Sequence, residues 1–147
     1  MTVNNSIAVT ACDNELVILA CQWGGSFELC RILSGNYNTV NVTIAITDGQ
    51  YQGPVVLNGV NGPLNETISV SLTPGSYNLA FVGLNWGGPK QFTIAYTNNS
   101  GITYNYSLPA SNPGTQFGGV VWVAQGPLTN VATCNTGAGD ILVVPQS

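Results

Sequence analysis

Side chains able to carry out acid–base or nucleophilic chemistry are scarce in this sequence. Its 147 residues include six carboxylates, two basic residues and no histidine. Without imidazole a serine lacks its usual general base, and no Gly-x-Ser-x-Gly elbow is present. Asp13 and Glu15 share one face of an extended segment beside Cys12, and we interpret them as solvated strand-end residues rather than as a glycosidase pair. We therefore expect no catalytic residues and no enzymatic activity.

Binding of metals, cofactors and nucleic acids is not indicated either. No loop carries the Asp-x-Asp-x-Asp-Gly pattern of a calcium site, and the chain has no histidine to complete a zinc site. Two basic residues cannot neutralise a row of phosphates. We expect no metal, no cofactor and no nucleic-acid partner.

The four cysteines are better suited to disulfides than to zinc. Cys12, Cys21 and Cys30 follow one another at intervals of nine residues and Cys134 lies far downstream, so no Cys-x-x-Cys pair occurs. We expect structural disulfides, for which three pairings are open. Cys21 with Cys30 would close a short loop and leave Cys12 to join Cys134. Cys12 could equally reach a neighbouring subunit, because it follows an N-terminal arm.

The composition is typical of a protein outside the cell. Charged residues make up 5% of the chain, against about a quarter in ordinary soluble domains. Acceptor triplets for N-linked glycans begin at Asn4, Asn41, Asn65, Asn98 and Asn105. Together with the cysteines, these features predict an extracellular or cell-surface protein that could carry glycans.

Two tryptophans are candidates for an exposed binding surface. Trp23 and Trp86 each precede a Gly-Gly pair. A flat indole beside flexible glycines suits a sugar ring, and it suits a subunit interface as well. A carbohydrate-binding module or lectin is therefore the alternative function, with glycans as the partner.

Alternation of apolar and polar residues dominates the chain and predicts β-strands. Val40, Val42, Ile44 and Ile46 alternate with polar or small residues, and similar segments recur about every ten residues with turn-forming residues between them. Residues 16–21 are a continuous apolar run, as in a strand buried on both faces. We expect an all-β chain that forms a single antiparallel β-sandwich of the Ig-like or jelly-roll type. It should have roughly eight to ten strands, no substantial helix and no membrane span.

Residues 1–11 form a strand-like N-terminal arm ahead of a single domain over residues 12–147. Val3, Ile7 and Val9 are its apolar positions. The arm is either the first strand of its own sheet or a donor strand that completes the sheet of a neighbouring copy. Lysine, which commonly protects sheet edges from pairing, occurs once.

These features together predict a non-enzymatic structural protein of the cell exterior. We expect a self-assembling subunit of a filament, pilus-like fibre or coat, whose partner is another copy of the same chain. Strand exchange through the arm would join the subunits, and disulfides would stabilise them.

Overall fold

The computed structural model describes residues 5–22, 25–34, 39–84, 90–111, 120–125 and 142–145. These residues form ten β-strands and no helix, so the expectation of an all-β chain is confirmed. The strands are β1 (Asn5–Gln22), β2 (Gly25–Ser34), β3 (Val40–Asp48), β4 (Val55–Gly59), β5 (Leu64–Leu72), β6 (Gly75–Leu84), β7 (Lys90–Thr97), β8 (Thr103–Ser111), β9 (Val120–Gln125) and β10 (Leu142–Val144). No helix long and apolar enough to cross a membrane occurs in this part of the chain.

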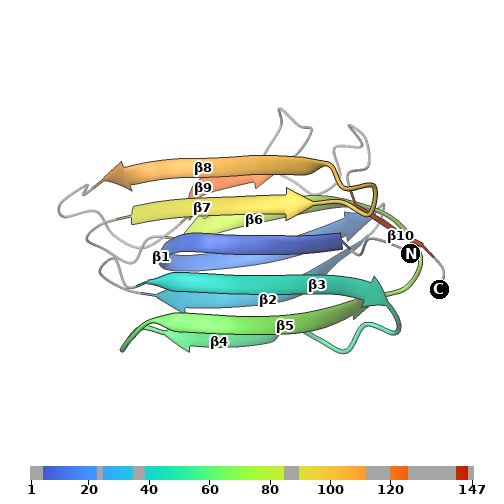
Figure 1. The fold of residues 1–147 in the computed structure, drawn as a ribbon, viewed down its shortest axis with the longest axis horizontal. Helices are drawn as coiled ribbons and strands as arrows, with labels where there is room; N and C mark the ends of the chain where they lie inside the picture. The colour runs from blue at the N-terminus through green and yellow to red at the C-terminus, as the bar shows by residue number, and fades with distance from the viewer. Residues whose placement is uncertain are drawn as a thin grey trace.

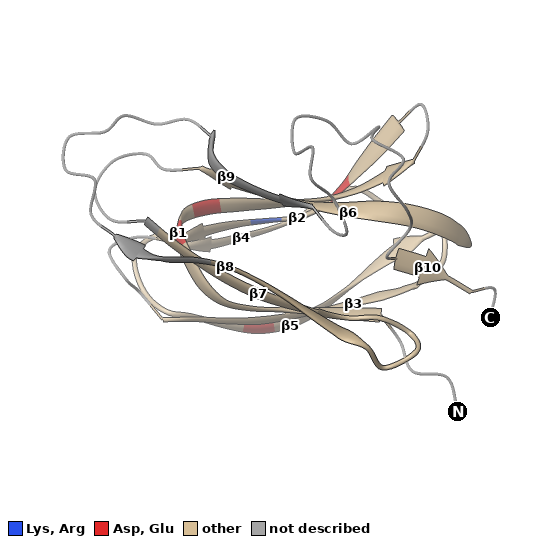
Figure 2. Cartoon of the chain, turned by 90° about the horizontal axis from the view of Figure 1, so that it is seen from above, with Lys and Arg blue, Asp and Glu red and all other residues tan. Residues whose placement is uncertain are grey.

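The strands lie in two layers that share β1 (Figures 1 and 2). The first half of β1 pairs with β3 on one side and with β7 on the other, and β5 and β8 extend this layer. The second half of β1 pairs with β2 and β6, and β4 and β9 extend that layer. We call them the arm layer and the opposite layer. β10 pairs with the start of β6.

Two of the pairings are parallel, which differs from the wholly antiparallel arrangement expected. β4 runs parallel to β2, and β5 runs parallel to β3. Parallel neighbours need a crossover connection, commonly a helix. Here the chain alternates between the layers from β2 to β5. The connection from β2 to β4 therefore contains β3, and the connection from β3 to β5 contains β4. The Ig-like or jelly-roll form of a β-sandwich stays a prediction.

The core lies between the layers and consists of the apolar positions of the alternating strands. The four predicted inward residues of β3 are all buried: Val40, Val42, Ile44 and Ile46. β6 and β7 contribute large buried rings, namely Tyr77, Phe81, Phe92 and Tyr96. In residues 16–21, a part of β1 that pairs with both β2 and β6, all side chains but that of Leu19 are buried. The strand predictions at these positions are confirmed.

Candidate functional site

The arm occupies a slot in the middle of the arm layer. Ile7 and Val9 are 0% exposed. Ile7 is opposite Ile44 of β3 and Tyr96 of β7, so its backbone lies between two hydrogen-bonded neighbours. The arm is thus a central strand of the layer, not an edge strand. Val3, the third predicted apolar residue of the arm, lies outside the described residues.

Asn5 fixes the beginning of β1, and its role was not predicted. Its amide nitrogen Nδ2 donates a hydrogen bond to the carbonyl oxygen of Val143, at 2.9 Å. Its Oδ1 accepts a hydrogen bond from the hydroxyl of Tyr96, at 2.8 Å. Burial raises the pKa of this hydroxyl, which therefore stays a donor. The partners lie 91 and 138 residues away along the chain, so no local sequence pattern could reveal them.

Where β1 passes from one layer to the other, two carboxylates are buried, and Arg31 of β2 lies against one of them. Asp13 and Glu15 are buried, so their interpretation as solvated strand-end residues is wrong. Arg31 of β2 forms ion pairs with Glu15 and with Glu28, the latter at 2.9 Å between Nη2 and Oε1. Arg31 donates hydrogen bonds to the carboxylates of Glu28 and Glu15, which raises its pKa, so its charge is permanent. This charged cluster fastens the second half of β1 to β2.

Two thiols lie next to this junction, in the core between the layers. Cys12 and Cys30 are buried and free, which differs from the disulfides expected at these positions. The Sγ of Cys12 donates to the carbonyl oxygen of Ile32 at 3.4 Å. Burial, with a smaller effect of Glu28, raises the pKa of Cys30 to about 12. Burial, with smaller effects of nearby charges, also raises the pKa of Cys12.

Of the other two cysteines for which disulfides were expected, the structure describes one. Cys21, near the end of β1, is 1% exposed and disulfide-bonded. Cys134 lies outside the described residues.

One side of the molecule presents two neighbouring strand edges (Figure 1). Among the described strands, β4 is hydrogen-bonded to β2 alone and β5 to β3 alone. Neither strand contains Lys, Arg or Pro, and Glu66 is their single charge. Val56 in β4 is 58% exposed. Edges of this kind lack the usual protection against pairing with another chain. Figure 2 shows how sparsely charge is distributed along the described strands.

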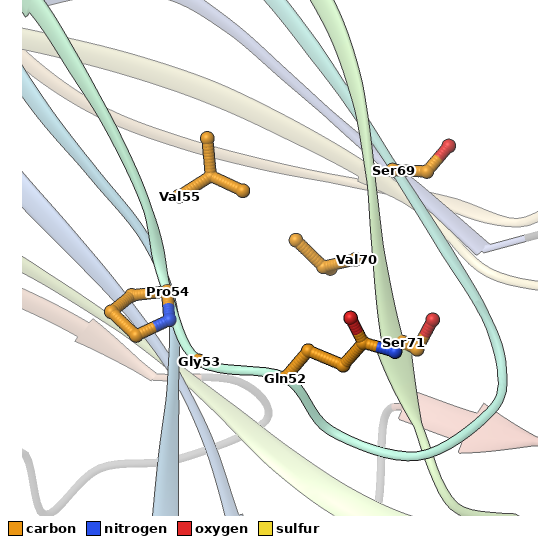
Figure 3. Close-up of a pocket in the computed structure, with 7 residues that line it drawn as sticks. All are labelled: Gln52, Gly53, Pro54, Val55, Ser69, Val70 and Ser71. Atoms are coloured by element: carbon orange, nitrogen blue, oxygen red, sulfur yellow. The ribbon is translucent and has the colours of Figure 1, made fainter.

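A pocket of about 300 Å³ opens between these two edge strands (Figure 3). Its lining comes from the segment that enters β4 and from β5: Gln52, Gly53, Pro54, Val55, Ser69, Val70 and Ser71. None of these side chains is ionisable, so the pocket offers no acid, base or charged anchor. In the part of the chain that the structure describes, no three His, Cys, Asp or Glu side chains are grouped as metal ligands.

The predicted glycan acceptors are distributed over the arm layer. Asn41, Asn65 and Asn105 are exposed. Asn41 and Asn65 are paired neighbours on β3 and β5, with Nδ2 to Oδ1 at 3.5 Å. Asn98 is partly buried, and its Oδ1 accepts hydrogen bonds from two backbone N–H groups of the loop between β7 and β8. Asn4 lies outside the described residues, as do Trp23 and Trp86.

No protein-family model, no curated protein and no solved structure matches this chain.

Proposed function

We propose that this chain is a non-enzymatic, self-assembling structural subunit of an extracellular or cell-surface filament, pilus-like fibre or coat. Subunits join by exchange of the N-terminal arm. The observation that carries this proposal is the position of the arm, whose buried Ile7 and Val9 lie in a slot between β3 and β7.

The slot requires a strand of one particular kind. If the arm left it, β3 and β7 would each expose a row of unpaired N–H and C=O groups in the middle of a layer. The replacement must hydrogen-bond on both edges and bury apolar side chains at alternate positions. The arm of another copy meets both requirements, because it carries the same residues in the same order.

The architecture of β1 allows its two halves to separate. Residues 5–13 pair within the arm layer, and residues 14–22 pair within the opposite layer. An arm can therefore leave its slot while the ladders of the second half stay intact. Glu15 belongs to that second half, and its ion pair with Arg31 of β2, which also pairs with Glu28, holds the half in place.

The surroundings of the slot support assembly outside the cell. The exposed edges of β4 and β5 carry no lysine or arginine that would oppose contact between chains. Three glycan acceptor asparagines are exposed, and charge is scarce throughout the chain. Two layers packed over an apolar core support a β-sandwich as the repeating unit. The lectin alternative stays a prediction, since both of its tryptophans lie outside the described residues.

Electron microscopy of the purified full chain at high concentration tests the proposal. We expect ordered filaments from the wild-type chain and from Thr10→Asp, whose side chain is exposed. Ile7→Asp places a charge on a fully buried arm position and should give dispersed particles. Dispersed wild-type particles at every concentration would overturn the proposal. Equal filament formation by Ile7→Asp would show that the arm is not the joining strand.

A further inference from the structure

We propose that Cys12 and Cys30 form a disulfide between subunits, which locks a donated arm into the chain that receives it. This inference rests on the proposed function, because it needs an arm that passes from one copy to another. It assigns a purpose to two thiols that are free in the single chain.

The two thiols approach the same part of the core from different layers. Cys12 belongs to the half of β1 that lies in the arm layer, where it is opposite Phe92 of β7. Cys30 lies on β2 in the opposite layer, paired with Ile18 and Val55. The Sγ of Cys12 contacts the carbonyl oxygen of Ile32, two residues beyond Cys30 on the same strand. Both cysteines are buried, at 3% and 0% exposure.

Arm exchange turns this pair into a link between chains. Cys12 is near the end of the exchanging half of β1, whereas Cys30 stays with the body of its own subunit. A donated arm that fills the slot in the same register brings the donor's Cys12 beside the acceptor's Cys30. Each subunit then gives one thiol and receives one, so the bonds form a continuous covalent chain.

The chemistry is thiol–disulfide exchange with a small-molecule disulfide such as oxidised glutathione. The thiolate of one cysteine attacks the oxidant and releases one glutathione thiol. The second cysteine then displaces the other glutathione and closes the S–S bond. The two protein thiols lose two electrons and two protons, and the oxidant is reduced to two thiols.

Burial of the thiols determines the stage of assembly at which the disulfide forms. A thiol is nucleophilic as the thiolate, and the raised pKa values of both cysteines keep them protonated once the arm is seated. Oxidation should therefore accompany entry of the arm into the slot, while the cysteines are still open to solvent. In filaments that are assembled first and oxidised afterwards, the disulfides should form more slowly.

The test assembles an equal mixture of unlabelled and ¹⁵N-labelled full chains in the presence of oxidised glutathione. We expect a ladder of covalent oligomers on a non-reducing denaturing gel. Mass spectrometry should find Cys12–Cys30 peptide pairs that combine one labelled and one unlabelled partner. Cys12→Ala and Cys30→Ala should each lose these peptide pairs and still form filaments. The isotope measurement uses the wild-type chain, so it does not depend on how the variants fold.

The outcomes separate this inference from the proposed function. Filaments without Cys12–Cys30 pairs, or with pairs of a single isotope, would overturn the lock and leave self-assembly standing. Dispersed particles whose Cys12–Cys30 pairs carry a single isotope would overturn both, since the arm would then lie in its own chain. Mixed-isotope pairs in filaments would support both.

Discussion

At the scale of single residues, Arg31 is the cation on which the buried carboxylate of Glu15 depends. The side chain of Glu15 is 6% exposed and that of Arg31 is 36% exposed. Arg31→Met removes this ion pair and leaves the carboxylate buried. We expect the free energy of unfolding at neutral pH to fall by about 2 kcal/mol, measured by chemical denaturation. Solvent reaches the guanidinium, so this loss is smaller than the roughly 3–5 kcal/mol of fully buried pairs.

Glu28→Gln is the matched control for that substitution. The side chain of Glu28 is 26% exposed, so water solvates this carboxylate, and its ion pair with Arg31 contributes less to stability. We expect a loss below about 1 kcal/mol. A loss for Glu28→Gln as large as that for Arg31→Met would contradict the assignment of Glu15 as the carboxylate that needs the cation.

Cys30 makes stability depend on pH in the alkaline range. Burial raises the pKa of its thiol from 9.0 to about 12, so above pH 9 the folded chain keeps a proton that the unfolded chain releases. The stabilising effect is complete below the unfolded pKa and is lost as the pH rises towards the folded pKa. We expect the free energy of unfolding to decline between about pH 9 and about pH 12, and to decline less steeply in Cys30→Ala. Urea unfolding over this range measures both slopes, and parallel slopes would contradict the prediction.

At the scale of strands, the sequence shows which side chains are inward but not which strands are neighbours. The period of two in β3 is a local property, so its buried face could be predicted. The parallel pairing of β3 with β5 depends on a crossover through the other layer, which no local pattern encodes. The burial of Glu15 was also not predicted, because Arg31, which forms an ion pair with it, lies on another strand. The arm was identified as a strand, while its place between β3 and β7 came from the structure.

Gly83 shows how closely the two layers approach each other. A Cβ atom added to it would lie 2.7 Å from ring carbons of Phe92, which belongs to the arm layer. Gly83→Ala must displace that ring, and we expect a loss of about 1–3 kcal/mol in the free energy of unfolding. Gly62→Ala is the control, because no atom lies within 4 Å of its added Cβ. Equal effects of the two substitutions in thermal or chemical unfolding would show that the layers can adjust without strain.

At the scale of the whole molecule, the scarcity of charge determines how assembly responds to salt. The chain has two basic and six acidic residues and a net charge of −4. Apolar burial and backbone hydrogen bonds should therefore drive contact between subunits, with little Coulomb attraction or repulsion to screen. Raising the salt from about 0.1 M to about 1 M shortens the Debye length from about 10 Å to about 3 Å. We expect the lowest concentration that gives filaments to change less than about threefold over this range. A change of a hundredfold in sedimentation assays would instead indicate an electrostatic interface.

A peptide with the sequence of the arm should stop the growth of filaments. In a polymer joined by arm exchange, one terminal subunit has a slot between β3 and β7 that no neighbour fills. A synthetic peptide of residues 1–12 carries the same Ile7 and Val9 and should bind there, because the slot accepts a strand by both of its edges. We expect mean filament length, measured by electron microscopy, to fall as the peptide concentration rises. A peptide with Ile7→Asp should leave the length unchanged, since its charge would enter a fully buried position. If both peptides leave the length unchanged, the arm stays in its own chain and the exposed edges of β4 and β5 become the next interface to test.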